Sequence, residues 1–260
     1  MNQTLVLLKI GGGLITVKQT PHTAKPAIIR SLASEISRAK KHYKFDLIAG
    51  TGAGSFGHFT AHHYGLRTGA QTPQQFFGVS KTHAEVAHLN KMFVHAMLRR
   101  SLPALSIAPS AIMTCRDGQL IKAELGAVQT AVHFGMIPVL HGDCLFDTSR
   151  GITILSTERL LEACLIKFRP IYEKIIVVYL TNKKGVLDSS GQVISDLTRD
   201  TELSITTTAT HDVTGGMAEK ITAARNAVDH GADAVYIACG LEKGVLAKLL
   251  SGQPTGTKVS

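Results

Sequence analysis

Two kinds of hydrophobic pattern alternate along this 260-residue chain. Continuous apolar runs are typical of strands buried on both faces, and they occur at residues 4–10, 45–49, 105–109, 137–141, 151–155, 174–180 and 234–238. Apolar residues at helical spacing predict helices at residues 25–44, 72–97, 124–134, 156–167, 218–230 and 244–250. Strands that alternate with helices predict an α/β sandwich built on a parallel sheet.

The pattern runs through the chain without an internal repeat or a linker. We therefore expect one domain, residues 1–260, with a soft boundary between two lobes near residues 155–168. The composition, 44% hydrophobic and 18% charged, is ordinary for a globular protein with a sizeable core. The four cysteines are widely spaced, which predicts reduced thiols in a cytoplasmic protein. No signal peptide and no membrane span is expected, because the apolar runs are too short.

A glycine-rich stretch at residues 51–58 follows the predicted strand 45–49 and precedes a possible helix start. Backbone N–H groups at such a place have no partners of their own and can bind an anion. Glycine lets the backbone approach that anion closely, and His58 adds a side-chain donor. Glycines 11–13 follow the first predicted strand, and Gly215 and Gly216 precede the helix 218–230. The repeated arrangement indicates phosphate binding.

Three lysines lie close to these glycines in the sequence. Lys9 ends a buried strand, so its ammonium either points out of the carboxyl edge of the sheet, where α/β folds bind ligands, or snorkels to solvent. Lys18 follows the first glycine run, and Lys220 lies one turn into a predicted helix. Asp143, after the strand 137–141, is left open as a loop anchor or a member of a Mg²⁺ network.

The formal net charge is +9, which favours anionic partners. The longest basic cluster, residues 38–44, is interpreted as the solvated end of a helix. The chain has no basic low-complexity tail and no nucleic-acid module, so anionic small substrates explain the charge equally well. We expect no nucleic acid and no membrane as partner.

The motifs at residues 9–13, 52–58, 141–143 and 212–217 together resemble the amino acid kinase superfamily. Within it, Gly-Ser-Phe-Gly-His at residues 54–58 is similar to the motif of isopentenyl phosphate kinases. The resemblance covers nearly the whole chain. It implies an open αβα sandwich with a mainly parallel central sheet, ATP-dependent phosphorylation of isopentenyl phosphate to isopentenyl diphosphate, Mg²⁺, and a homodimer. Residues 1–155 would bind the phosphate acceptor, and residues 156–260 the nucleotide.

The resemblance also implies roles for individual residues. Lys18 would stabilise the transition state, and His58 would contact the substrate phosphate together with Ala53. Gly54 would lie near the transferring group, where it would contact both substrate and ATP. The other residues that would face ATP are Lys9, Gly11, Gly12, Gly13, Asn182, Gly216 and Lys220. No residue is assigned as a metal ligand.

Several positions depart from the family pattern. Gly13 stands where serine is usual, and Thr51 where a histidine often precedes the glycine turn. Thr157 and Glu158 replace Gly-Asp, whose amide meets the substrate and whose carboxylate organises the lysines. Asn182 replaces an aspartate beside the nucleotide. These changes bear on metal handling, rate and nucleotide contacts, and they leave the acceptor turn intact.

Elementary electrostatics agrees with a phosphate acceptor. A phosphate monoester has a second pKa of roughly 6, so its attacking oxygen is largely ionised at neutral pH and needs no general base. Two unit charges at ~4 Å repel by about 4 kcal/mol at an effective dielectric constant near 20. Catalysis is therefore positioning plus fixed positive charge. The alternatives that remain open are a fosfomycin-type phosphonate kinase and a ligand-binding relative that has lost catalysis.

Overall fold

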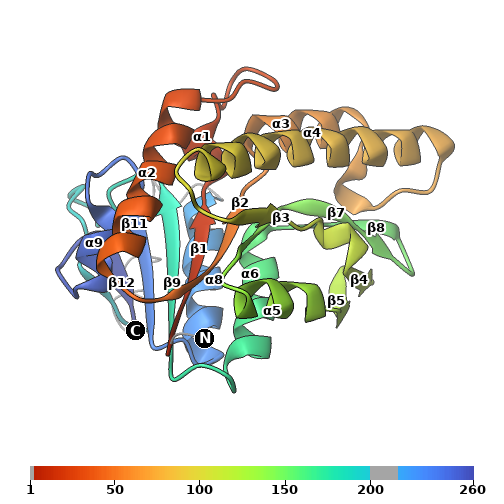
Figure 1. Cartoon of the computed structure of the whole chain (residues 1–260). Helices are drawn as coiled ribbons and strands as arrows, with labels where there is room; N and C mark the ends of the chain where they lie inside the picture. The colour runs from red at the N-terminus through yellow and green to blue at the C-terminus, as the bar shows by residue number, and fades with distance from the viewer. Residues whose placement is uncertain (1–2, 200–215) are drawn as a thin grey trace.

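The computed structural model describes residues 3–199 and 216–260. Its main sheet has the strand order β10-β12-β11-β9-β1-β2-β6-β3 (Figure 1). In this order, neighbouring strands are parallel except β11 and β12, which are antiparallel. The strands are β1 (Thr4–Ile10), β2 (Asp46–Thr51), β3 (Ala104–Ser106), β6 (Ile137–His141), β9 (Lys174–Thr181), β10 (Asp196–Leu197), β11 (Ala234–Cys239) and β12 (Thr257–Val259).

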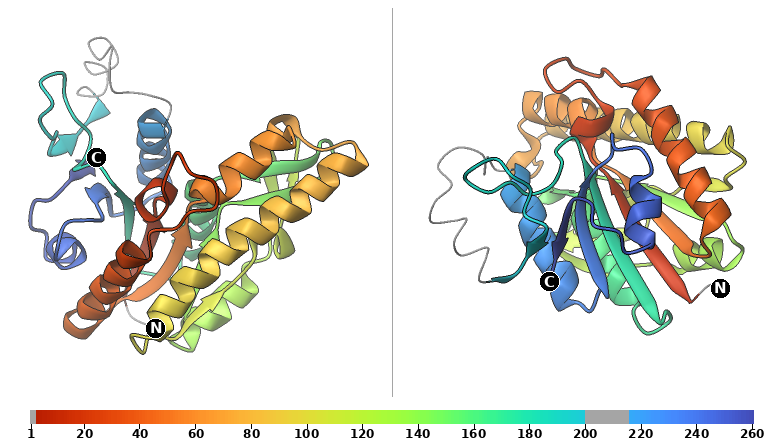
Figure 2. Two further views of the ribbon diagram at one scale, coloured as in Figure 1. Left: turned by 90° about the horizontal axis from the view of Figure 1, so that it is seen from above. Right: turned by 90° about the vertical axis from the view of Figure 1, so that its left-hand side faces the viewer.

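Helices cover both faces of this sheet (Figures 1 and 2). On one face lie α2 (Pro26–His42), α4 (Pro73–Leu98) and α9 (Val245–Leu250); on the other lie α5 (Gly126–His133), α6 (Thr157–Phe168) and α8 (Gly216–Asp229). Alternate residues of β1 enter the two separate cores, with Leu8 in one and Leu7 in the other. Burial on both faces explains why β1 is an unbroken apolar run.

A second sheet, of order β5-β4-β7-β8, lies beside the main one. Its strands are β4 (Met113–Arg116), β5 (Gln119–Ala123), β7 (Asp143–Asp147) and β8 (Gly151–Leu155). The helix α3 (Gly54–His63), the 3-10 turn η1 (Leu66–Thr68) and the start of α4 project over β7 and β8 (Figure 1). A small apolar core of Ala61, Leu66, Ala70, Cys144 and Ile152 fills the space between them.

The predicted fold class is confirmed: the protein is an α/β sandwich whose main sheet is largely parallel. The interpretation of residues 51–58 as an open turn was wrong in part, because α3 already begins at Gly54 and includes His58. The second sheet was predicted only at β8. The threonine-rich stretch at residues 201–210, which the sequence predicts as a loop or an irregular edge, lies outside the described residues.

Both expected lobes contribute strands to the main sheet. β1 pairs with β2 on one side and with β9 on the other, so the main sheet crosses the expected lobe boundary without a break. None of the helices within residues 3–199 and 216–260 is long and apolar enough to cross a lipid bilayer. A short one-turn helix, α1 (Gly12–Ile15), follows β1 and leads into the loop that carries Lys18.

Candidate active site

Lys9 lies at the carboxyl end of β1 and is buried, with 6% of its surface exposed. Its Nζ donates a hydrogen bond to Glu158 Oε1 in the first turn of α6. Burial opposes ionisation of Glu158, but the Lys9 ammonium prevails and lowers the pKa of this carboxyl. Lys9 therefore does not snorkel to solvent; its ammonium is held by a carboxylate at the sheet edge. Ser156 caps α6 by accepting a hydrogen bond from the Arg159 N–H.

The first two glycine runs pack against each other. Gly11 donates to the carbonyl of Leu180, and Gly52 donates to the carbonyl of Ile10. A Cβ on Gly12 would lie 2.3 Å from the Gly54 nitrogen, and Gly54 itself has φ of +52°. Glycine is required at both positions, because one needs close approach and the other a left-handed backbone.

Thr16 stabilises the packing of these two glycine runs through two hydrogen bonds. Its Oγ1 donates to the Gly12 carbonyl at 2.8 Å and accepts from the Ser55 N–H at 3.1 Å. The turn after β1 and the start of α3 therefore form one rigid unit. Ala53 is the residue immediately before α3, and no side-chain hydrogen bond caps that helix. The start of α3 follows β2 at the same sheet edge as Lys9, and a helix start at this place suits a phosphate group.

A pocket of about 410 Å³ opens beside this unit. Lys18 and His58 both line it, together with Gly13, Thr16, Gly54, Ser55, Phe59 and His62. Partial desolvation lowers the pKa of His58, the positive charges of Lys18 and Lys9 lower it further, and Glu219 opposes them. His58 thus lies within electrostatic reach of two lysines and one carboxylate.

The start of α8, with Gly216 and Lys220, lies near Lys9, Lys18 and His58. The Lys220 Nζ donates to the Gly216 carbonyl. The pKa of Lys220 is lowered, mainly by partial burial and also by the positive charge of Lys9. The carboxylates of Glu158 and Glu219 oppose this shift. The structure therefore brings Lys9, Lys18, His58 and Lys220 to one edge of the sheet. Glu219 was missed by the sequence analysis, although its place directly before Lys220 was a signal for it.

Thr157 and Asn182 are two further residues predicted for the site. Thr157 is buried, its hydroxyl donates to the Thr51 carbonyl at 2.9 Å, and its methyl group packs against Gly50. Its side chain thus joins α6 to β2. Asn182 is exposed directly after β9, at the same sheet edge as Lys9. The motif residues 212–215 lie outside the described residues.

The described residues also limit the choice of metal ligands. Within residues 3–199 and 216–260, no group of three or more His, Cys, Asp or Glu side chains is arranged to hold a metal ion. Mg²⁺ in phosphotransferases is held largely by phosphate oxygens and water, with one or two carboxylates. Of the two described carboxylates near the lysines, Glu158 is engaged by Lys9, whereas Glu219 acts on Lys220 and His58 only through its charge.

A profile of the amino acid kinase family matches residues 4–239. The chain belongs to this family, and it is therefore a kinase, an enzyme that transfers a phosphoryl group.

Several relatives of this chain are named isopentenyl phosphate kinase. An isopentenyl phosphate kinase of Methanothermobacter thermautotrophicus is 29% identical over 98% of this chain and 99% of its own length. An isopentenyl phosphate kinase of Haloferax volcanii is 31% identical over 84% of this chain and 86% of its own length. A solved isopentenyl phosphate kinase structure superposes with a TM-score of 0.80 at 24% identity, covering 98% of this chain and 99% of that one. A substrate complex of an isopentenyl phosphate kinase gives the same TM-score, with 98% and 100% covered. These two superpositions, at 24% and 22% identity, support the fold.

Proposed function

We propose that this kinase transfers the γ-phosphoryl group of ATP to isopentenyl phosphate and releases isopentenyl diphosphate, a step in isoprenoid precursor synthesis. The observation that carries the proposal is the convergence of Lys9, Lys18, His58 and Lys220 where the glycine turn after β1 meets α3. The relatives named isopentenyl phosphate kinase support the choice of acceptor.

The acceptor phosphate would bind at the start of α3. Ala53 and Gly54 offer backbone N–H groups, and His58 offers an imidazole donor one turn further along the helix. The lowered pKa of His58 keeps the imidazole neutral at pH 7 in the absence of a ligand, so it binds as a hydrogen-bond donor. The acceptor oxygen is already ionised, so this site needs no general base.

The lysines would hold the transferred group. Lys9 is positioned by Glu158, and Lys220 lies beside both, so two cations face the nucleotide phosphates. Gly11, Gly12 and Gly13 allow the backbone close to the same phosphates. Lys18 lines the same pocket as His58, and it would neutralise charge that develops in the transition state. Asn182, directly after β9, and Gly216, at the start of α8, would contact the nucleotide.

Mg²⁺ would supply a further positive charge shared between the nucleotide phosphates when it is bound. Among residues 3–199 and 216–260, Glu219 is the side chain that would hold it. We also propose that the protein is a cytoplasmic homodimer that binds no nucleic acid. Lobe roles follow from the same assignment: residues 1–155 bind the acceptor and residues 156–260 the nucleotide.

The test is to incubate the purified protein with isopentenyl phosphate and Mg-ATP, in parallel with a panel of small phosphonates, and to measure ADP and diphosphate formation. Turnover of isopentenyl phosphate is expected. Turnover of a phosphonate alone would move the assignment to a phosphonate kinase. Nucleotide binding by calorimetry without any turnover would make the protein a ligand-binding relative.

A further inference from the structure

A second cavity, of about 790 Å³, lies at the edge of the main sheet that β11, β12 and β10 form. It shares no lining residue with the pocket that contains Lys18 and His58. In the strand order, β9 and β1 separate it from β2, which leads into the acceptor turn. A molecule bound in this cavity would therefore be distinct from the phosphate acceptor.

The cavity lies on the α9 face of the sheet. Lys258 of β12 is the register partner of Tyr236 on β11 and of Asp196 on β10, and all three line the cavity. Val259 and Leu197, the next residues along β12 and β10, pack in the same core as α8. Because successive side chains of a strand point to opposite faces, Lys258 and Asp196 lie on the other face, where Tyr236 packs in the core that contains α9. The groups at the start of α8 are thus on the far side of the sheet.

Two lysines of this cavity are available to a ligand. Lys184, in the loop after β9, and Lys258 both line it. Neither ammonium group makes a hydrogen bond or an ion pair with another residue in the described part of the chain. Both side chains are exposed, so they remain charged and hydrated until a ligand replaces the water.

The two carboxylates of the cavity are already bonded within the chain. Glu242 accepts hydrogen bonds from the Lys248 Nζ and, at 2.8 Å, from the Thr255 Oγ1, and these two donors lower its pKa. One oxygen of Asp196 accepts a hydrogen bond from the Ser260 Oγ at 2.9 Å. The groups without a partner are therefore the cations, which favours an anionic ligand.

Apolar side chains line another part of the same cavity. Leu241, in the loop after β11, and Val193, before β10, are exposed there, and Pro254 lies in the loop before β12. The ring of Tyr236 adds an aromatic surface. Covering such surface removes it from water and stabilises a complex. The ligand that fits these surroundings has a hydrocarbon part as well as a negative charge.

We propose that this cavity binds an amphiphilic organic anion, a phosphate or diphosphate ester whose charged group is bound by Lys184 and Lys258 and whose hydrocarbon chain covers Leu241 and Val193. Lysine binds phosphate groups as a point charge and needs no fixed geometry to do so. The volume lies within the roughly 300–1,000 Å³ of pockets that hold small organic ligands. This inference goes beyond the proposed function, because the cavity contains none of the groups assigned to phosphoryl transfer.

The probes are geranyl diphosphate and inorganic diphosphate, compared by calorimetry on the full chain. We expect geranyl diphosphate to bind at least about tenfold more tightly, because burial of only two methylene groups is worth about that factor. Lys258→Gln and Lys184→Gln should each weaken its binding at least about fivefold, since each removes a charged donor to the diphosphate. Lys243→Gln, which changes an exposed lysine outside the cavity lining, is the control.

A second pair of variants tests the hydrocarbon part. Leu241→Ser should reduce the preference for geranyl diphosphate over inorganic diphosphate at least about threefold. Leu98→Ser, at a similarly exposed leucine that ends α4, should leave the preference unchanged. All of these side chains are exposed, so the variants are expected to fold.

The His58→Ala variant separates this cavity from the acceptor pocket. Binding of geranyl diphosphate that persists in His58→Ala and weakens in the two lysine variants supports the inference. Binding that is lost in His58→Ala, that is unchanged in both Lys184→Gln and Lys258→Gln, or that is no tighter than the binding of inorganic diphosphate would overturn it. Phosphoryl transfer plays no part in this measurement, so a protein that does not phosphorylate isopentenyl phosphate would overturn the proposed function alone.

Discussion

His22 Nδ1 lies 3.0 Å from Glu85 Oε2, and this contact joins the loop that carries Lys18 to α4. The same loop is also bonded to α3, because the His22 N–H donates a hydrogen bond to the Ser55 carbonyl at 3.3 Å. The His22 ring also packs edge-on against Phe56, with 5.8 Å between ring centroids. The position of Lys18 over the pocket therefore depends on contacts with α3 and α4.

We expect His22→Ala to lower kcat at least about tenfold with little change in the KM for ATP, because small misplacements of a catalytic group cost large factors in rate. Glu85→Gln, which keeps a polar side chain of similar size, should have a smaller effect of the same kind. Steady-state kinetics with both substrates checks this. His42→Ala, an exposed position on α2, is the control. An unchanged kcat in His22→Ala would show that the loop does not need the contact.

The ion pair of Lys9 and Glu158 leads to a second prediction. Both side chains are largely buried, at 7% and 13% exposure, so removing one charge leaves the other without its partner in a poorly solvated place. Glu158→Gln should lower the free energy of unfolding by about 3 kcal/mol and reduce kcat strongly. Glu158→Asp keeps the charge and should retain most of both. Denaturant unfolding and kinetics on each variant provide the measurement.

A surface pair supplies the matched control for this prediction. Lys122 and Glu124 also form an ion pair, but their side chains are 65% and 67% exposed. Glu124→Gln should change the free energy of unfolding by no more than about 0.5 kcal/mol. Similar losses in Glu158→Gln and Glu124→Gln would contradict the importance assigned to the buried pair.

Adjacent glycines after β1 should respond very differently to the same substitution. A Cβ at Gly12 would meet backbone atoms of Gly54, whereas a Cβ at Gly13 would meet no described atom within 4 Å. Gly12→Ala is therefore expected to separate the two glycine runs and abolish activity. Gly13→Ala should leave stability close to wild type, because the added methyl group enters open space at the pocket. Thermal unfolding and kinetics of the two variants test this, and equal tolerance of both would contradict the packing described above.

Lys18 and His58, which both line the pocket, should affect different kinetic constants. Lys18→Ala should depress kcat more than KM, because its charge is required mainly in the transition state. His58→Ala should raise the KM for the acceptor and lower kcat/KM by several powers of ten, because it removes a donor to the bound phosphate. Near-normal kinetics in His58→Ala would remove His58 from the site.

The parallel half of the fold could be predicted from the sequence, because strands buried on both faces are continuous apolar runs that a single chain displays plainly. β1, β6 and β9 are examples. The hairpin of β4 and β5 was missed because it is half exposed, with Gln119 and Lys122 on its open side. β7 was missed because Gly142 looks like the end of a strand. In the structure, β7 begins directly after this glycine, which separates it from β6.

The candidate site could be predicted only where the type of residue itself indicates a chemical role. Glycine runs and a lysine at the end of a buried strand do so, and these residues lie together in the structure. The contacts of His83 with Asp143 and of His22 with Glu85 join residues 60 and 63 positions apart, and no local pattern reveals them. The substrate contact that the family resemblance implies for Thr157 stays a prediction, and the bond of its hydroxyl to the Thr51 carbonyl could not be foreseen from the sequence.

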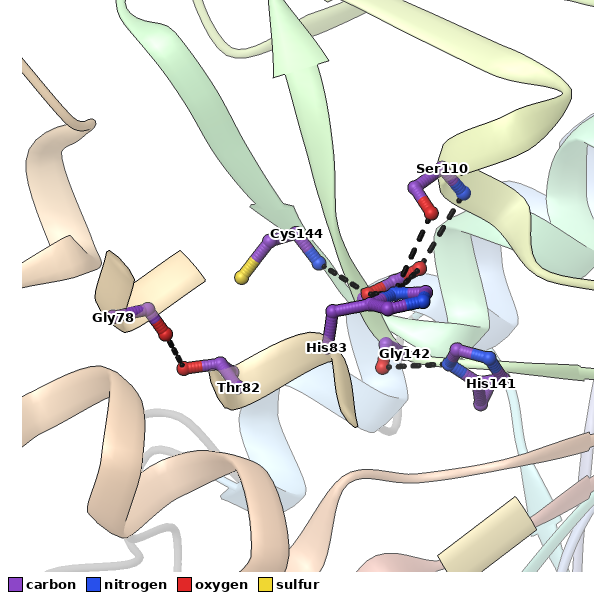
Figure 3. Close-up of polar contacts among 8 residues, drawn as sticks. Gly78, Thr82, His83, Ser110, His141, Gly142 and Cys144 are labelled. Atoms are coloured by element: carbon purple, nitrogen blue, oxygen red, sulfur yellow. Dashed lines mark hydrogen bonds and ion pairs between the residues drawn. The ribbon is translucent and has the colours of Figure 1, made fainter. Parts of the chain in front are cut away.

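The pairing of His83 (Figure 3) with Asp143 makes stability depend on pH. The Asp143 carboxylate raises the pKa of His83 above its ordinary value of 6.5, so the protonated imidazole is favoured in the folded state. Stability from this source is fully present below pH about 6.5 and is lost as the pH rises through the higher folded-state pKa.

The difference in free energy of unfolding between the wild-type protein and His83→Gln should therefore be larger at about pH 6 than at about pH 9. Because the imidazole is more than one third exposed, screening by solvent should keep this change below about 1 kcal/mol. Urea unfolding at both pH values measures it, with His95→Gln as the control on the same helix. A difference that grows with pH would show that the neutral imidazole is the form that the fold stabilises.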